Sequence, residues 1–148
     1  MGDALVKCVL HIVFSTKNRA ELLSENIQRE LYPYFGGVCR NKGLLFMAAD
    51  GTKDHVHLLL ALPATVTIAD AVRDLKANSS RWVHEHFSSE FKWQVGYGAF
   101  SVSSSRIKET IDYIHNQKEH HRKVTFQEEY VNFLRLYNIE YNEKYLWE

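Results

Sequence analysis

The chain has 148 residues, 45% of them hydrophobic, and a formal net charge of zero at pH 7, as expected for one globular domain with a full core. The balanced charge argues against sequence-blind binding to nucleic acid, and two cysteines are too few for a disulfide framework. The sequence has no signal-peptide pattern and no apolar run long enough to span a bilayer, so we expect a cytoplasmic protein without a membrane partner.

The first part of the chain predicts a strand followed by a helix. Residues 5–14 are rich in Val, Ile and Leu, which favour strands. Ser24 is placed to cap the helix that follows. Within that helix Pro33 is expected to cause an end or a kink, and Gly36-Gly37 to stop it.

The middle and the end of the chain predict three more strands and three more helices. Residues 44–49 and 56–62 are expected to form the second and third strands, and residues 95–102 the fourth. Thr67 is placed to cap a helix between the third and fourth strands, and Thr125 to cap the last helix. A further helix lies between the fourth strand and Thr125.

This order of elements predicts the fold class. Strand, helix, strand, strand, helix, strand is the ferredoxin-like split βαβ pattern, an α+β fold whose antiparallel sheet has helices packed on one face. We expect a single domain over residues 1–148, with a helical and aromatic C-terminal tail from about residue 125. The aromatic, acidic segment 137–147 is expected to pack on the body or on a second subunit.

Two histidines on the third predicted strand are candidate metal ligands. Because side chains alternate across a strand, His55 and His57 point to one face and Val56 points to the other. Each imidazole can offer one neutral nitrogen to a metal ion. A pair of histidines at this spacing also occurs in sheets as ordinary packing residues, so the pair needs a second motif to support it.

The second motif is the segment YIHNQ at residues 113–117. Tyr113 and Gln117 are four residues apart in a predicted helix and therefore share one face. Next to the two histidines, they would complete a divalent-metal site beside a phenol nucleophile. Such a mixture of nitrogen and oxygen ligands suits Mg²⁺ or Mn²⁺, and Zn²⁺ accepts the same ligand types. The alternative is that Tyr113 only packs on its helix face.

The chain resembles the single-tyrosine HUH transposases of small single-strand insertion sequences, which include the REP-associated tyrosine transposases. "HUH" denotes two histidines around a bulky hydrophobic residue. The resemblance extends from about residue 5 to residue 129 and rests on four ordered segments: HIVFSTK at 11–17, HVH at 55–57, WQVGYGAFSVS at 93–103, and YIHNQ at 113–117 followed by HHRK at 120–123.

This resemblance implies a DNA transposase that acts in DNA transposition and recombination. It would cleave and rejoin single-stranded DNA near hairpins or palindromes, with Tyr113 forming a 5′-phosphotyrosine and with His55, His57 and Gln117 holding Mg²⁺ or Mn²⁺. The resemblance also implies a homodimer in a prokaryotic cell, associated with the nucleoid during action. Two alternatives stay open: a domesticated or inactive hairpin-binding protein of the same fold, and a small metal-sensing protein.

Basic and aromatic residues near these motifs are candidate DNA contacts, because cations hold phosphates and aromatic rings stack on bases. Taken one at a time, each fits an ordinary surface or core residue better than a DNA contact. The histidines at 115, 120 and 121 do not form a three-ligand set by spacing, and His11 is expected to be a buried structural residue. The candidate contacts are Lys53, Arg73, Lys76, Arg81, Trp82, Arg106, Lys108, Arg122 and Lys123.

Overall fold

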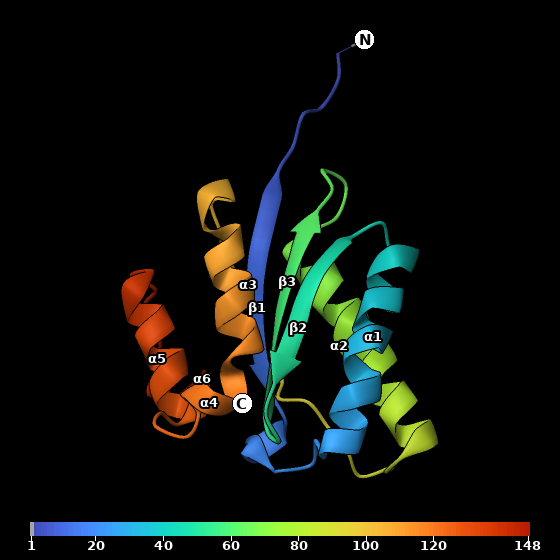
Figure 1. Ribbon diagram of the computed structural model, residues 1–148, viewed down its shortest axis with the longest axis vertical. Helices are drawn as coiled ribbons and strands as arrows, with labels where there is room; N and C mark the ends of the chain where they lie inside the picture. Colours follow the sequence, from blue (N-terminus) through green and yellow to red (C-terminus); the bar gives the residue numbers. More distant parts are fainter. Residues whose placement is uncertain (1) are drawn as a thin grey trace.

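An antiparallel sheet of four strands, in the order β2-β3-β1-β4, organises the computed structural model, which describes residues 2–148 (Figure 1). The central strands β1 and β3 are paired along their whole length, from Cys8 opposite Leu62 to Ser15 opposite His55. The elements are β1 (Cys8–Ser15), α1 (Glu25–Asn41), β2 (Leu45–Gly51), β3 (His55–Leu62), α2 (Ile68–His86), β4 (Gly98–Ser101), α3 (Ile107–His115), α4 (Gln117–His120), α5 (Phe126–Leu136) and α6 (Glu143–Leu146), with short 3₁₀ turns at Lys17–Arg19 and Ser104–Arg106.

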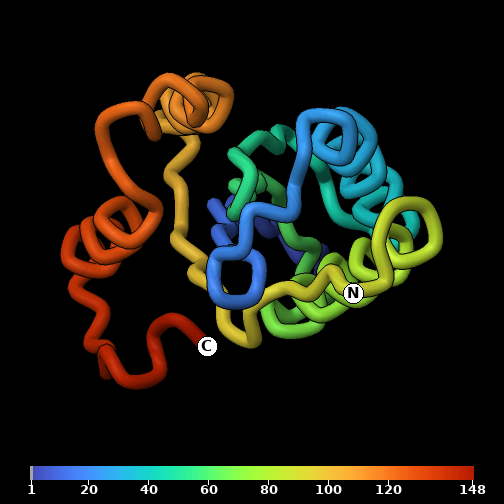
Figure 2. The backbone as a smooth tube through the Cα atoms, turned by 90° about the horizontal axis from the view of Figure 1, so that it is seen from below, coloured from blue at the N-terminus to red at the C-terminus, as the bar shows by residue number. Residues whose placement is uncertain are grey.

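Helices cover both faces of this sheet. Helices α1 and α2 pack on one face, where Val56, Leu58 and Leu60 of β3 join the main hydrophobic core. On the other face Leu59 packs with Ile114 of α3, and α5 lies beside α3 and packs on Val13 of β1 and Phe100 of β4 (Figures 1 and 2). The predicted α+β fold with its split βαβ order is confirmed, with α1 and α2 on one face. The helices that follow β4 form a second layer on the opposite face.

Helix α1 departs from its prediction. It is capped by Ser24, whose hydroxyl accepts a hydrogen bond from the Ile27 amide at 3.3 Å, but it continues through Pro33 and Gly36 as far as Asn41. The expected stop at the glycines is wrong. The absence of a side chain at Gly36 serves the packing of α1 on the sheet and does not end the helix. A Cβ on Gly36 would lie 3.3 Å from the Phe46 ring of β2, so glycine allows the helix to approach the sheet closely.

The C-terminal tail packs on the body of the protein. Trp147, directly after α6, places its ring 5.8 Å from the Tyr130 ring and 6.3 Å from the Phe126 ring. The backbone amide of Gly96 donates to the carbonyl of Glu148 at 2.8 Å. Within residues 2–148, no helix combines the length and the apolar character needed to cross a bilayer.

Strand β4 is shorter than predicted because the segment before it is held as a loop by Lys76 of α2. The Lys76 ammonium donates to the carbonyls of Gln94, Val95 and Gly96 at 2.8, 3.1 and 2.6 Å. The same ammonium lies 5.1 Å from the centre of the Phe14 ring, and burial lowers the pKa of Lys76 to about 8. Lys76 was a candidate DNA contact, but its donors are used within the chain.

We predict that Lys76→Met destabilises the fold, because three carbonyls lose a charged donor while the aliphatic stem keeps its packing. The expected loss in the free energy of unfolding is about 1–3 kcal/mol, measured by urea denaturation followed by circular dichroism. Lys92→Met, at an exposed lysine near the same loop, is the matched control. Equal urea midpoints for the two variants would show that the carbonyl contacts do not stabilise the loop.

Candidate active site

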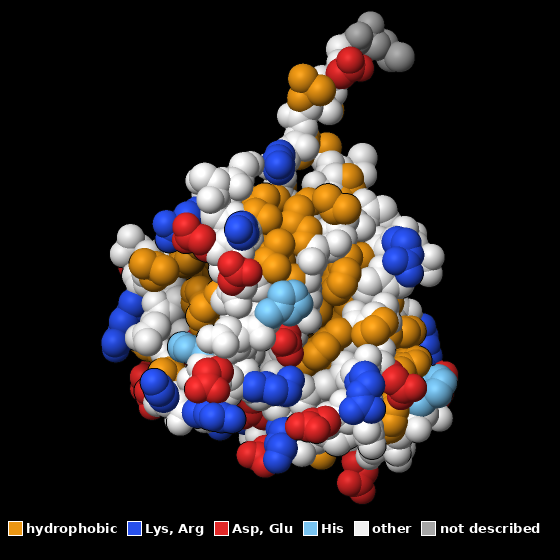
Figure 3. All heavy atoms as spheres, in the orientation of Figure 1, with side chains coloured by type: hydrophobic (Ala, Val, Ile, Leu, Met, Phe, Trp, Pro, Cys, Tyr) orange, Lys and Arg blue, Asp and Glu red, His pale blue; other side chains and the backbone are white. Residues whose placement is uncertain are grey.

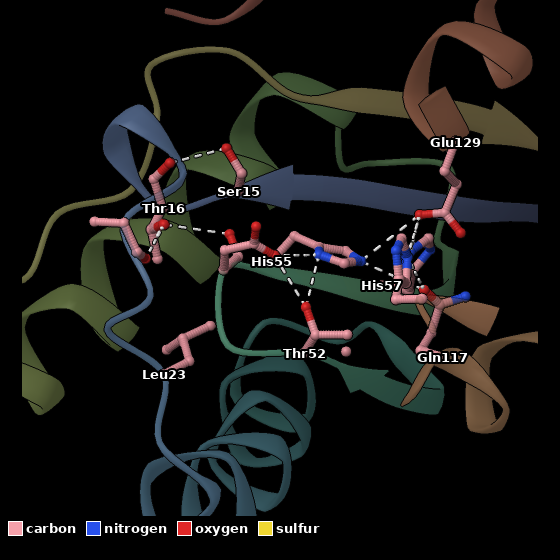
Figure 4. A network of polar contacts seen from close by, with 12 residues as sticks. Ser15, Thr16, Leu23, Thr52, His55, His57, Gln117 and Glu129 are labelled. Atoms are coloured by element: carbon pink, nitrogen blue, oxygen red, sulfur yellow. Dashed lines mark hydrogen bonds and ion pairs between the residues drawn. The ribbon is translucent and has the colours of Figure 1, made fainter. Parts of the chain in front are cut away.

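The two strand histidines lie side by side on the sheet face that α3 and α5 cover (Figure 4). His55 and His57 are both fully buried. The Nδ1 atom of His55 lies 2.7 Å from Asp54 Oδ1 and 3.0 Å from Thr52 Oγ1, which fixes the ring and leaves Nε2 directed toward the helices. The turn before His55 is tight: a Cβ on Gly51 would overlap the His55 carbonyl oxygen.

The tyrosine motif meets these histidines within one chain. The Tyr113 ring of α3 lies 5.9 Å from the His57 ring. Helix α3 ends at His115, but the chain turns directly into α4, and the buried Gln117 places its Oε1 atom 3.4 Å from His55 Nε2. The four side chains singled out by their spacing therefore come together, and their roles stay predictions.

Two further residues complete this cluster. Glu129, buried on α5, places Oε1 2.9 Å from His57 Nε2 and 3.6 Å from His55 Nε2. His121 Nε2 lies 3.1 Å from the same oxygen and 3.0 Å from Gln117 Oε1. One ligand atom from each of His55, His57, His121 and Glu129 lies within 4.8 Å of the others, so the cluster could bind a metal ion.

The spacing of residues in the sequence indicates His121 but not Glu129. His121 follows Gln117 by four residues, the same interval that separates Gln117 from Tyr113, so the periodicity could have identified it. It joins the cluster through Gln117 and Glu129, and its neighbour His120 also reaches the cluster, with Nε2 3.3 Å from Glu129 Oε2. Glu129 carries no such signal, because only the packing of α5 against the sheet brings it to His57.

The charge of Glu129 controls the state of the tyrosine. Burial alone would raise the pKa of Glu129, but hydrogen bonds from His121 and His57 outweigh it and hold this pKa far below its usual range. The Tyr113 hydroxyl donates to Glu129 Oε2. Burial and the neighbouring negative charge both raise the pKa of Tyr113 far above its ordinary value. In this arrangement Tyr113 is a neutral phenol that needs additional positive charge to become a phenolate.

His11 on β1 supports the site from behind. Its Nε2 atom lies 2.7 Å from His57 Nδ1, on the side of the ring opposite to Glu129. Burial lowers the pKa of His11 to about 3 and that of His57 to about 4. Because both rings are neutral, one must donate and the other accept. If His57 offers Nε2 to a metal, its Nδ1–H donates to His11 and keeps the ring in that orientation.

The predicted DNA contacts divide between the two faces of the sheet. Arg73, Arg81 and Trp82 lie on α2, across the sheet from the cluster. Lys53 and Arg122 line a cavity of about 700 Å³ beside His121, and Arg106 lines one of about 720 Å³ beside Tyr113. Lys108 and Lys123 are exposed and lie outside both cavities.

The chain is similar to known transposases in sequence and structure. Residues 4–117 match the family model for IS200-like transposases. The transposases for insertion sequence element IS200 of Salmonella typhimurium and Salmonella typhi are each 29% identical over 119 residues, covering 76% of this chain and 78% of theirs.

Two solved structures share this fold. A putative transposase from Deinococcus radiodurans is 26% identical with a TM-score of 0.64, over 79% of this chain and 98% of the other. A REP-associated tyrosine transposase bound to a REP hairpin is 18% identical with a TM-score of 0.62, over 84% of this chain and 76% of that one. The second likeness concerns the fold alone.

We predict that His11→Phe weakens binding of Mn²⁺ without unfolding the protein. Phenylalanine fills the same aromatic space but cannot accept a hydrogen bond from His57. Loss of such a supporting contact typically weakens metal binding by about 10- to 100-fold, which isothermal titration calorimetry measures directly. The control is His86→Phe, at an exposed histidine of α2. Unchanged Mn²⁺ affinity in His11→Phe would contradict the supporting role.

Proposed function

As this chain belongs to the IS200-like transposase family, it is a DNA transposase, and we propose that it cleaves and rejoins single-stranded DNA through a covalent bond to Tyr113. The observation that carries this proposal is the convergence of the Tyr113 hydroxyl, two buried imidazoles and a carboxamide oxygen within one chain. A phenol beside a set of metal ligands has the chemistry of an activated nucleophile.

The metal in this proposal is Mg²⁺ or Mn²⁺, held by His55, His57 and Gln117. The donors fit such an ion because imidazole nitrogens and an amide oxygen face the same point, and Glu129 and His121 stand within reach of it. A divalent cation supplies positive charge that stabilises a phenolate and polarises a phosphate oxygen.

The chemical step balances without an external energy source. The Tyr113 oxygen forms a bond to phosphorus while the bond from phosphorus to the 3′-oxygen breaks. The DNA on the 3′ side of the break stays on Tyr113 through its 5′-phosphate, as a phosphodiester, and the phenolic proton ends on the 3′-hydroxyl of the released strand. Because the energy of the phosphodiester bond is retained, attack by a 3′-hydroxyl reverses the step and joins new strands.

Glu129 is the residue that positions the attacking oxygen. Its Oε2 atom accepts the hydrogen bond from the Tyr113 hydroxyl while Oε1 faces the imidazoles of His57 and His121. In the proposed reaction this carboxylate accepts the hydrogen bond of the neutral phenol and keeps the Tyr113 oxygen beside the metal ligands. The depressed pKa of Glu129 keeps it ionised for that task at neutral pH.

The proposed substrate is single-stranded DNA next to a hairpin. This choice is supported by the likeness to a REP-associated transposase whose structure contains a REP hairpin. Arg106 near Tyr113, and Lys53, Lys118 and Arg122 near His121, place cations on both sides of the cluster. Carboxylates line the same two cavities: Glu21, Glu25, Asp54, Glu109 and Glu129. Such a distribution of cations suits a strand that passes through the site with its phosphates bound by cations.

We predict that Tyr113→Phe abolishes cleavage but retains the fold and DNA binding, because phenylalanine keeps the ring and removes the attacking oxygen. The assay incubates the protein with Mn²⁺ and single-stranded hairpins taken from DNA flanking its gene, then detects a covalent protein–DNA adduct on a denaturing gel. Tyr97→Phe, at a half-buried tyrosine, is the matched control and should form the adduct normally.

His57→Ala should lose the adduct in the same assay, and so should wild-type protein in EDTA. Adduct formation by Tyr113→Phe would refute the mechanism, and mass spectrometry of the adduct would identify the residue that attacks. Hairpin binding by wild-type protein without any adduct would favour the alternative of an inactive hairpin-binding protein.

We also propose a homodimer, which the family resemblance implies. Helix α3 reaches the histidines of its own chain here, so a second copy is not needed to bring Tyr113 to His57. Apolar side chains are exposed over the strands beside α3 (Figure 3), and Leu45 on the edge strand β2 is 61% exposed. An edge strand with apolar neighbours is suited to pairing with a second copy.

The dimer is tested by light scattering after size exclusion at micromolar concentration. The expected species has twice the chain mass of 17.3 kDa. A single species at the mass of one chain, across the concentration range, would contradict the dimer but not the covalent mechanism.

A further inference from the structure

A cavity of about 720 Å³ opens beside Tyr113, between α3, α5 and the end of β4. It shares Tyr113 and Glu129 with the catalytic cluster, and His11 and His120 also line it. From there it extends toward Phe133 and Tyr137. Its volume lies in the range of about 300–1,000 Å³ that is typical of sites for small organic ligands. The proposed cleavage step uses only its edge.

We propose that this cavity binds one unpaired nucleotide of the DNA strand, the nucleotide that adjoins the phosphate attacked by Tyr113. This inference rests on the proposed function, because that function defines which phosphate is attacked. The base would stack against the aromatic side chains of Phe133 and Tyr137, and its phosphate would face Arg106. The cavity would therefore select the base next to the cleavage point.

Aromatic side chains form the wall against which a base would stack. Phe133 lies parallel to Phe100 with ring centres 5.1 Å apart, and Tyr137 lies 5.0 Å from Phe100 on the surface side. The Tyr137 hydroxyl donates to the Ser101 carbonyl at 3.0 Å, which fixes the ring over the cavity. Tyr137 is still 39% exposed, so part of its surface is available to a base.

Polar groups at the rim can read a base and hold a phosphate. The exposed Asn132 lines the cavity and carries both a donor and an acceptor, the pattern that matches the edge of a base. Arg106 also lines the cavity, and its Nε atom lies 3.3 Å from a carboxylate oxygen of Glu109. A guanidinium has five N–H donors, so this ion pair leaves others for a phosphate.

The position of the cavity favours a nucleotide of the cleaved strand over a free metabolite. Tyr113 and Glu129 form part of its lining, so a group bound there lies next to the attacking oxygen. A strand whose phosphate reaches Tyr113 must place an adjoining nucleotide close to this opening. The base of that nucleotide needs little energy to turn into the cavity, because a single strand has no pairing to break.

The first test titrates wild-type protein labelled with ¹⁵N, in EDTA, with each of the four 2′-deoxynucleoside 5′-monophosphates. We expect amide shifts centred on residues 132–137 and on Arg106, strongest for one of the four bases. Tyr137→Ala and Asn132→Ala should each weaken this binding by about fivefold or more, as expected when a stacking or base-edge contact is lost. Tyr137→Phe should retain most of the affinity, and the matched control Tyr145→Ala all of it.

Several outcomes of this titration would overturn the proposal. These are the absence of shifts, shifts confined to other surfaces, equal binding by Tyr137→Ala and wild-type protein, or the same shifts with inorganic phosphate alone. Because EDTA removes divalent metal and no bond is cleaved, none of these outcomes depends on the covalent mechanism.

The second test places a single abasic nucleotide at successive positions of a hairpin oligonucleotide that forms the covalent adduct. One position next to the cleaved phosphate should reduce adduct formation about tenfold with wild-type protein. Tyr137→Ala should show a similar loss on intact DNA and little further loss with the abasic site, because both changes remove the same contact.

Two outcomes would overturn the cavity proposal and leave the proposed cleavage intact. These are fully additive losses from the abasic site and Tyr137→Ala, or the absence of any sensitive position in DNA that still forms the adduct. Nucleotide binding at the cavity without any adduct would contradict the proposed cleavage but support the proposal that the cavity binds a nucleotide.

Discussion

The carboxylate of Glu129 joins α5 to three other parts of the chain. It reaches from α5 to His57 on β3, to His121 after α4 and to Tyr113 on α3. Burying a charge is costly unless hydrogen bonds and opposite charges surround it. Here the imidazoles and the phenol provide that environment, so the position of α5 and the arrangement of the cluster depend on one another.

The sheet supplies the rigid base for this contact. Antiparallel pairing places Val13 opposite His57 and Ser15 opposite His55 across the two central strands. His11, two residues before Val13, can then reach the back of the His57 ring at 2.7 Å. The result is a row of hydrogen-bonded groups from β1 through β3 to α5, in which each member fixes the orientation of the next.

Much of this arrangement follows from local sequence rules. Alternation along β3 places His55 and His57 on one face, and the caps at Ser24, Thr67 and Thr125 form as expected. The interval of four residues brought Gln117 to the correct side of Tyr113 even though the chain leaves α3 at His115. These features depend on neighbours within a few residues, which is why the sequence alone could predict them.

The features that could not be predicted depend on packing between distant segments. Helix α1 continues past Gly36, where glycine allows close packing on β2: a Cβ at this position would lie 3.3 Å from the Phe46 ring. Strand β4 is short because Lys76 draws the carbonyls before it toward α2. Glu129 is part of the cluster only because α5 folds back over the sheet. In each case a contact between segments that are distant in the sequence determines the structure, which local propensity does not.

The match to the family model ends at Gln117, whereas His121 and Glu129 come after it. A chimera that exchanged only residues 4–117 with a relative would carry the motifs and leave behind the carboxylate that touches both Tyr113 and His57. The natural unit for transplanting or recombining this site therefore extends at least through Glu129. A boundary placed at the end of the motifs would separate the Tyr113 hydroxyl from the carboxylate that accepts its hydrogen bond.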